Sequence, residues 1–283
     1  MPNEMTSLKA FEKSPYRSVK WTTYFPVYDA LFSKYKGTDV TFVEIGVLDG
    51  GSLFMWREFL GPKARIIGVE FNPGAKKWEE HGFEIFIGDQ TDKDFWKKFY
   101  EEVGPVDVLL DDGGHTFDQQ IITVECARDS IRDGGLIVVE DTHSSYQKNF
   151  YGPSKLSFIE YAKNIVDGIN FRHATLNVKK PSETTIQSTQ FFESIVSFHI
   201  SKTLAGMTCE FVDNGGEPAD AEDFRIEATR FKRLEDLGKK FSFFSNLPVI
   251  GRFLRKPYRF LMRNLYKSQA ASIRSGLKQY FKY

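Results

Sequence analysis

Residues 106–115 are Val-Asp-Val-Leu-Leu-Asp-Asp-Gly-Gly-His. In this stretch a short, mainly apolar run is followed by two acids, two glycines and a histidine. A second segment, Leu-Ile-Val-Val-Glu-Asp-Thr-His at residues 136–143, repeats that arrangement. Short runs of Val, Leu and Ile bounded by Gly or Pro predict strands that are buried on both faces of a parallel sheet. The polar residues after each run are then expected at neighbouring strand ends, where open parallel sheets bind ligands.

Strand and helix patterns alternate on both sides of these two segments. Five strand–helix units predict an α/β fold with a doubly wound, mostly parallel sheet and helices on both faces. Two later apolar runs, 171–178 and 191–200, have no helix between them and predict an antiparallel hairpin at the sheet edge. The expected elements of the five units are, in chain order, 41–47, 52–60, 64–69, 75–81, 84–87, 92–102, 106–110, 117–131, 136–139 and 155–166.

The length of 283 residues is long for one domain and short for two. We expect an N-terminal helical lid or packing segment at 1–38, with a helix over 25–35. The main domain is expected at 39–205, and a basic, aromatic extension at 206–283.

Cysteine usage and hydropathy limit the class of protein. Cys126 and Cys209 are the two cysteines, and their wide spacing argues against a disulfide framework or a zinc site. The first 20 residues lack an apolar run of signal-peptide length, and no stretch approaches 18 apolar residues. We therefore expect a cytoplasmic protein.

The C-terminal region is strongly basic, although the whole chain is neutral. Residues 225–283 hold 15 basic and 3 acidic side chains, and 241–267 interleave large apolar residues with Arg and Lys. This composition suits peripheral docking on the inner face of a membrane, near lipid-linked glycans. The alternatives are a homo-oligomer interface with the acidic body of another subunit, nonspecific nucleic-acid contact, or a packed extension; specific nucleic-acid binding is not expected.

A glycine-rich turn, Glu-Ile-Gly-Val-Leu-Asp-Gly-Gly-Ser at 44–52, closes the first expected strand. Leu48 occupies a position where the dinucleotide fingerprint needs Gly, so we expect a ligand without a pyrophosphate. Glu70, after the second strand, is placed to accept hydrogen bonds from ribose, and Asp89 and Gln90, after the third, to meet adenine. The structural alternatives are a tight turn and solvated loop acids.

Together these motifs resemble the class I S-adenosylmethionine-dependent methyltransferases, which have a Rossmann-like fold. The resemblance covers about residues 41–201. The motifs are E-x-G-x-x-x-G-G-S, the acid at 70, Gly-Asp at 88–89, D-x-G-x-H, and V-E-D-T-H-x-S-Y. The match is narrower with the metal-dependent sugar O-methyltransferases of macrolide tailoring, of the mycinamicin and macrocin type, and with the related cephalosporin-hydroxylase-like group.

The resemblance implies roles for individual residues. Glu44, Gly46 and Ser52 would border the methionine part of the cofactor, with Glu70 at its ribose and Asp89 at its adenine. It also implies that Mg²⁺ is held by three carboxylates and that one imidazole is the general base. These residues are Asp112, Glu140 and Asp141 for the metal, and His115 for the base.

The chemistry of the residues supports a metal site independently. Carboxylates are hard oxygen ligands suited to Mg²⁺, and His115 titrates near neutral pH. Asp111 either faces the cofactor or holds the strand end by hydrogen bonding. His143 is a candidate substrate contact, metal-ligand partner or alternative base, and Tyr146 a candidate lid over a sugar. The structural alternative is that these are helix caps, loop acids and packing aromatics.

We therefore expect transfer of a methyl group from S-adenosylmethionine, with the help of Mg²⁺, to a sugar hydroxyl of a glycan or glycosylated natural product. A catechol-like diol is an alternative acceptor, because vicinal hydroxyls chelate Mg²⁺ equally well. A non-catalytic nucleoside-binding membrane adaptor is the alternative from another class.

Overall fold

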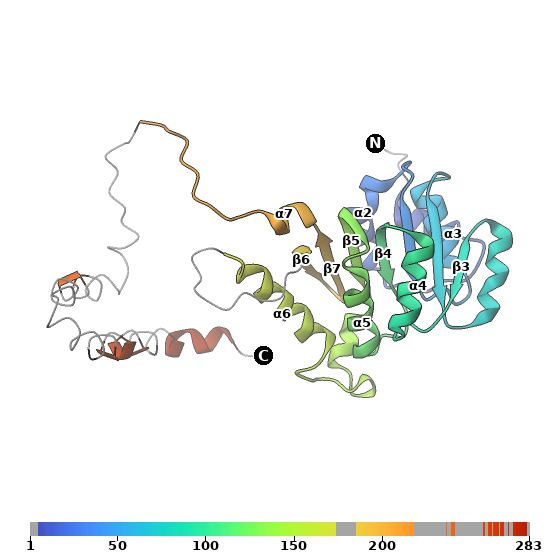
Figure 1. The fold of residues 1–283 in the computed structure, drawn as a ribbon. Helices are drawn as coiled ribbons and strands as arrows, with labels where there is room; N and C mark the ends of the chain where they lie inside the picture. Colours follow the sequence, from blue (N-terminus) through green and yellow to red (C-terminus); the bar gives the residue numbers. More distant parts are fainter. Residues whose placement is uncertain are drawn as a thin grey trace. The chain divides into compact units, whose positions relative to one another are not determined.

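A computed structural model describes residues 5–173, 185–217 and scattered positions between 236 and 281. The chain divides into two compact units, residues 1–211 and 212–283. Figure 1 shows the elements of the first unit, which holds every predicted site residue.

The first unit is built on a mixed sheet of seven strands among the residues described, in the order β3-β2-β1-β4-β5-β7-β6. The first five in this order pair in parallel, whereas β7 pairs antiparallel with both β5 and β6. The chain order reverses between β1 and β4, and ligands bind at such reversals. The strands are β1 (Thr41–Ile45), β2 (Arg65–Glu70), β3 (Glu84–Ile87), β4 (Val106–Asp111), β5 (Ile131–Val139), β6 (Ile186–Phe192) and β7 (Ile195–Ile200).

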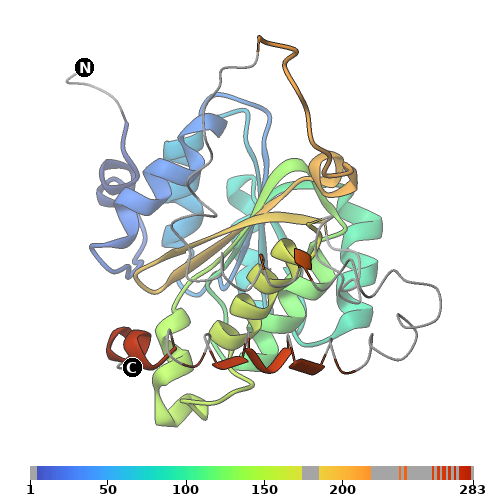
Figure 2. The same ribbon diagram turned by 90° about the vertical axis from the view of Figure 1, so that its left-hand side faces the viewer.

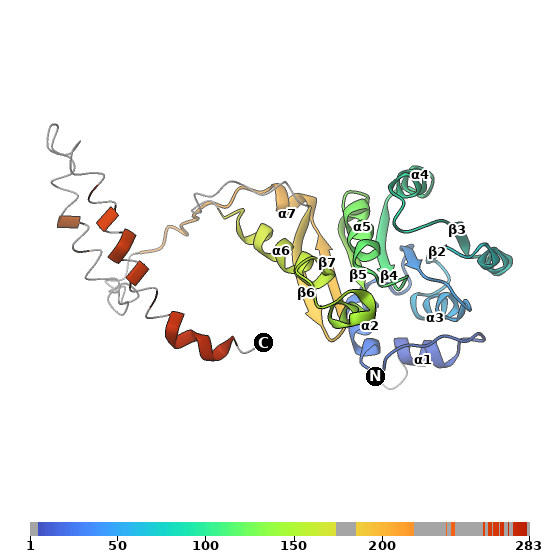
Figure 3. The same ribbon diagram turned by 90° about the horizontal axis from the view of Figure 1, so that it is seen from below.

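Helices cover both faces of the sheet, as a doubly wound sheet requires. Figures 2 and 3 show the N-terminal helices and α3 on one side of the strands, with α4 and α5 on the other. Two buried apolar clusters fill the two interfaces, and successive strand residues alternate between them. The helices are α1 (Ser7–Glu12), α2 (Tyr24–Phe32), α3 (Gly51–Leu60), α4 (Lys93–Val103), α5 (Phe117–Ala127), α6 (Phe158–Asn170) and α7 (Lys202–Gly206), with 3₁₀ turns η1 (Ser33–Tyr35), η2 (Pro73–His81), η3 (Thr142–Tyr146) and η4 (Lys148–Phe150).

Local sequence explains where several of these helices begin. The side chains of Asp92 and Ser157 accept hydrogen bonds from backbone N–H groups in the first turns of α4 and α6. Thr116 and Gln119 form a reciprocal capping box at the start of α5. These caps fix the direction of each helix after its strand.

The fold class predicted from the sequence is confirmed, but three local expectations were wrong. The hairpin exists, yet Phe171 ends α6 and starts no strand, and residues 174–178 lie outside the described residues. The strand expected over 191–200 is interrupted by a tight turn at Glu193 and Ser194, so it contains the end of β6 and the whole of β7. The helix expected over 75–81 is the 3₁₀ segment η2.

Most of the basic segment 241–267 lies outside the described residues, so the alternatives for its role stay predictions. Among the described positions of the second unit, η5 (Lys278–Tyr280) forms a short 3₁₀ turn. Within the parts of the chain that are described, no helix is both long enough and apolar enough to cross a membrane.

Candidate active site

The carboxyl ends of β1 to β5 form one edge that carries the predicted site residues. We call the ends of β1, β2 and β3 the glycine half and the ends of β4 and β5 the carboxylate half. Backbone hydrogen bonds extend the ladder beyond the strands: Asp112 N–H donates to the carbonyl of Ile45 (3.0 Å), and Glu140 N–H to that of Asp111 (2.9 Å). Asp112 and Glu140 therefore lie on adjacent strand ends, as predicted.

The glycines of the turn at 44–52 are required by close backbone packing. A side chain on Gly46, where φ is +88°, would collide with the carbonyl of Asp112. A side chain on Gly50 would collide with the ring of Trp78, and one on Gly51 with carbonyl groups from the N-terminal segment. Structural packing thus accounts for all three, whether or not a cofactor also approaches the turn.

Glu70 links the ends of β1 and β2 in the glycine half through hydrogen bonds to the backbone. One carboxylate oxygen accepts hydrogen bonds from the N–H groups of Val47 (2.8 Å) and Leu48 (3.0 Å), and the other from those of Phe71 (2.9 Å) and Asn72 (3.0 Å). Burial alone would raise the pKa of this carboxyl, but the four donors lower it below its usual range. Backbone N–H groups thus occupy all four lone-pair directions of the Glu70 carboxylate. The contact between Glu70 and ribose stays a prediction.

Glu44 and Ser52 are both buried behind the turn. Glu44 accepts hydrogen bonds from Ser52 Oγ (2.7 Å) and from the indole of Trp56 (3.0 Å). Burial raises the pKa of Glu44 to about 7, although Lys20 and these two donors oppose the rise. Glu44 and Ser52, both predicted to border the cofactor, therefore form a buried hydrogen-bonded pair.

Gln90 and Asp111 connect the two halves from the α5 side of the sheet. The Gln90 amide donates to both carboxylate oxygens of Asp111 (3.2 Å each) and accepts from Gly114 N–H (2.9 Å). Burial raises the pKa of Asp111, against the opposing effect of the Gly113 N–H and Gln90. These contacts match the strand-end role considered for Asp111. Asp89 lies nearer the surface and accepts from the N–H and hydroxyl of Thr91 (2.8 Å each).

A lysine from the N-terminal segment lies between two of the predicted metal ligands. Lys20 Nζ donates to Asp112 Oδ2 (2.6 Å) and to Glu140 Oε2 (2.9 Å), and the other Glu140 oxygen accepts from the Tyr28 hydroxyl (2.6 Å). Burial alone would lower the pKa of Lys20, but the two carboxylates raise it well above its ordinary value. Burial raises the pKa of Glu140, an effect that Lys20 opposes.

Asp141 and His115 complete the carboxylate half. His115 Nε2 lies 3.3 Å from Asp141 Oδ2, and the other Asp141 oxygen accepts from the Tyr24 hydroxyl (2.6 Å). One potential ligand atom from each of Asp112, His115 and Asp141 lies within 4.8 Å of the others, in a partly exposed group. Asp112 and Glu140 already bind an ammonium, and Asp112 and Asp141 offer hard carboxylate oxygens, so this cluster fits a cation such as Mg²⁺.

The two predicted substrate residues differ in their surroundings. His143 Nδ1 forms a hydrogen bond with Ser194 Oγ, and its ring meets the edge of Trp21 at 6.1 Å. Tyr146 is 63 % exposed at the end of η3, and Trp21 is 61 % exposed. An exposed aromatic surface therefore borders the carboxylate half, while contact with a substrate remains a prediction.

Backbone strain is concentrated along this edge. His115 and Asp141 have φ values of 61° and 52°, and Leu48 and Ser194 have values of 46° and 60°. Non-glycine residues rarely adopt such angles, and they cluster at functional sites, where the surrounding structure holds them. The contact between His115 and Asp141 is thus held by the fold in backbone conformations that carry an energetic cost.

Sequence reasoning missed four residues of the site: Lys20, Tyr24, Tyr28 and Ser194. The first three recur at intervals of four, a spacing that places Tyr24 and Tyr28 on one face of α2. That spacing is a usable signal, but residues 1–38 were predicted only as a lid or packing segment. Ser194 follows no pattern, because a turn between distant strands brings it to the site.

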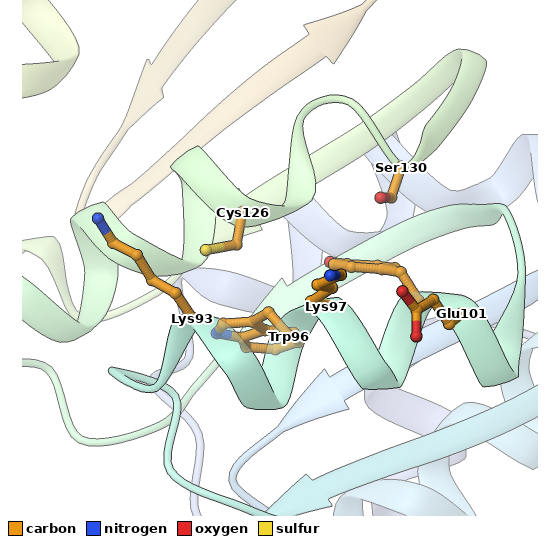
Figure 4. A pocket seen from close by; sticks show the side chains of 7 residues that line it. Lys93, Trp96, Lys97, Glu101, Cys126 and Ser130 are labelled. Carbon is orange, nitrogen blue, oxygen red and sulfur yellow. The ribbon is translucent and has the colours of Figure 1, made fainter.

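A separate pocket of about 410 Å³ lies between α4 and α5 (Figure 4). None of its lining residues is a predicted site residue, and it lies on a helical face rather than at the strand ends. The lining residues are Lys93, Trp96, Lys97, Tyr100, Glu101, Cys126 and Ser130.

Residues 43–142, which include both halves of the edge, match the family model described as a methyltransferase domain. The chain contains a methyltransferase domain. The resemblance inferred from its motifs is thereby confirmed. The turn, the acid at 70 and the carboxylate half up to Asp141 all lie within the matched range, whereas Lys20, Tyr24, Tyr28 and Ser194 lie outside it.

The curated proteins to which this chain is similar are O-methyltransferases, and two of them are named for rhamnosyl tetracenomycin C compounds. The chain is 30 % identical over 210 residues to mycinamicin VI 2''-O-methyltransferase of Micromonospora griseorubida, covering 70 % of this chain and 50 % of the relative. It is 28 % identical over 228 residues to demethylmacrocin O-methyltransferase of Streptomyces fradiae, covering 76 % and 55 %. The chain spans about half the length of the curated relatives it matches.

The fold is shared with a solved structure. MycE, a methyltransferase from the mycinamycin biosynthetic pathway determined in complex with Mg and SAH, aligns with a TM-score of 0.62 at 22 % identity. The alignment covers 70 % of this chain and 55 % of that one. At this identity the likeness establishes the Rossmann-like fold with its antiparallel strand pair.

Proposed function

We propose that this methyltransferase transfers a methyl group from S-adenosylmethionine to a sugar hydroxyl with the help of Mg²⁺. The observation that carries the proposal is the cluster of Asp112, His115 and Asp141, which joins a candidate base to candidate metal ligands beside the glycine turn. The names of three curated relatives, O-methyltransferases named for rhamnosyl or olivosyl compounds, support the acceptor class.

Asp112, Glu140 and Asp141 would hold the metal ion. Bound there, Mg²⁺ would lower the pKa of an acceptor hydroxyl and neutralise the carboxylates. His115 would take the hydroxyl proton, and Asp141, whose Oδ2 lies 3.3 Å from the imidazole Nε2, would stabilise the imidazolium that forms. The methyl carbon then forms its bond to oxygen as its bond to sulfur breaks, and the neutral thioether leaves without needing an acid.

The glycine half would bind the cofactor. Its backbone is fixed by Glu70 and by the buried pair of Glu44 and Ser52, so a ligand meets a rigid turn. Exposed Leu48 and Phe71 follow β1 and β2 and offer apolar surface for an adenosine. Positioning of the two reactants is the main task, because methyl transfer from a sulfonium needs little other catalysis.

The sugar would belong to a glycosylated natural product or a glycan, with a lipid-linked glycan as the acceptor if the basic segment 241–267 docks on a membrane. Exposed Trp21 and Tyr146 border the carboxylate half, where a sugar ring would lie. A screen of glycosides, nucleotide sugars and a catechol would separate these acceptor classes.

The decisive test is calorimetric titration of S-adenosylhomocysteine into the purified protein, followed by Mg²⁺. We expect both to bind, and we expect Asp112→Asn to lose the metal signal while Asp167→Asn, an exposed acid on α6, keeps it. Cofactor binding without any metal signal would contradict the Mg²⁺ part of the proposal. Binding of neither would contradict the methyltransferase activity itself.

A further inference from the structure

Lys20 places a full positive charge inside the carboxylate half. Its side chain is only 2 % exposed, and its ammonium contacts Asp112 and Glu140 at 2.6 and 2.9 Å. The ring of Tyr28 lies 5.8 Å from the same nitrogen. A buried lysine is costly unless its charge is paired, so the two carboxylates determine where this side chain lies.

The carboxylates need a cation as much as the lysine needs them. Glu140 is fully buried, and the side chains of Asp112 and Asp141 are about one-fifth exposed. Lys20 bridges Asp112 and Glu140, and oxygens of Asp112 and Asp141 lie within 4.8 Å of each other, so three carboxyl groups share a small volume. Like charges at this separation repel, and burial strengthens that repulsion. Lys20 neutralises one of them and bridges two.

The lysine is carried by residues 14–20, which we call the strap. Ser14 Oγ donates to the carbonyl of Gly51 (2.8 Å), and the Tyr16 ring packs 4.5 Å from that of Trp78. The carbonyls of Tyr16 and Arg17 lie so close to Gly51 that no side chain fits there. The strap therefore crosses the glycine turn and ends at the metal ligands, and it contacts both halves of the edge.

We propose that Lys20 is an internal cation that competes with the divalent metal for Asp112 and Glu140, so that metal binding releases the strap. This inference rests on the proposed function, because it takes these carboxylates to be metal ligands. The ammonium, 2.6 Å from Asp112 Oδ2 and 2.9 Å from Glu140 Oε2, fills the position from which a dication would contact both oxygens. Two cations so close also repel, so each must weaken the binding of the other.

The competition predicts an increase in metal affinity when the charge is removed. In Lys20→Met, we expect the affinity for Mn²⁺ to rise about tenfold, within the usual range of coupling between two ligands. Lys20→Arg keeps the charge and should bind Mn²⁺ no more tightly than the wild type. Lys13→Met is the matched control, because Lys13 pairs with exposed Glu58 outside the site.

The experiment is calorimetric titration of Mn²⁺ into the full-length wild type and the three variants, each also titrated with S-adenosylhomocysteine. Hydrogen exchange of the wild type with and without Mn²⁺ should show faster exchange of strap amides when the metal is bound. This measurement keeps the test decisive if Lys20→Met does not fold.

Equal or weaker Mn²⁺ binding by a folded Lys20→Met would overturn the competition, and so would strap exchange that Mn²⁺ leaves unchanged or slows. Metal binding with normal affinity in every variant would refute this inference alone. Absence of Mn²⁺ binding in all of them would refute both the inference and the metal part of the proposed function, and the S-adenosylhomocysteine titration would then show whether the cofactor part survives.

Discussion

The glycine half and the carboxylate half occupy the same sheet edge but are assembled in different ways. In the glycine half, Glu70 binds backbone N–H groups of its own and the preceding strand end, and Glu44 binds side chains 8 and 12 residues away. In the carboxylate half, Asp112 and Glu140 meet Lys20, which is 92 and 120 residues distant. The acids of the glycine half are bound by groups close to them in the sequence, whereas Asp112 and Glu140 are paired by a side chain from the distant N-terminal segment.

The carboxylate half therefore depends more strongly than the glycine half on the positions of distant segments. A locally hydrogen-bonded turn keeps its shape as long as its own strands pair. A cluster whose charges are balanced from distant segments changes when any of those segments moves. We therefore expect substitutions in the two halves to have separable effects on cofactor and metal.

The largest expected effect is that of His115→Ala. Removal of a general base costs about 10²–10⁴-fold in turnover, and the affinity for S-adenosylhomocysteine should not change, because His115 lies in the carboxylate half. The measurements are kcat in a methyl-transfer assay and calorimetry of the inhibitor. Retention of turnover would remove His115 from the mechanism.

Asp112→Asn should weaken Mg²⁺ binding by about 100-fold or more, beyond the 10–100-fold typical of residues that only support a ligand. The change leaves cofactor affinity intact if the halves are separable. Calorimetry with each ligand measures both constants. A parallel loss of both affinities would show that the halves act as one unit.

Glu44→Gln tests the buried pair through pH. The pKa of Glu44 is raised by burial to about 7, above its ordinary value of 4.5, so the stability associated with its protonated form is present below about pH 4.5 and lost as the pH rises through 7. As the pH rises from 4.5 to 7, the free energy of unfolding of the wild type should fall by at most about 3 kcal/mol relative to that of the variant. Urea unfolding of both proteins from pH 4.5 to 8 gives the difference, and parallel curves would contradict the raised pKa.

Glu70→Gln is expected to have the smallest effect of the four. Glutamine has one acceptor oxygen, so about half of the four backbone N–H contacts lose their partner, which costs about 2 kcal/mol in the free energy of unfolding. Cofactor affinity should fall while Mg²⁺ affinity is retained. Denaturation and the two titrations measure this, and weakened Mg²⁺ binding would break the separation of the halves.

The sequence predicted most of the fold because periodicity is a local property. Short apolar runs and capped amphipathic helices specified the parallel strands and the order of the units. The hairpin was misplaced because β6 (Ile186–Phe192) contains Gln187, Ser188, Thr189 and Gln190, and only pairing with β7 makes this polar segment a strand.

For the site, the sequence alone determined which acids end the strands and which face of the sheet each one occupies. Side chains alternate along a strand, so Glu44 and Glu140 share the face of α2 and α3, while Asp111 points to α5. The side chains that cover those acids follow from long-range packing. Lys20, Tyr24, Tyr28 and Ser194 reach the cluster from outside the matched domain, because buried charges need partners and the chain supplies them through contacts that no local pattern encodes.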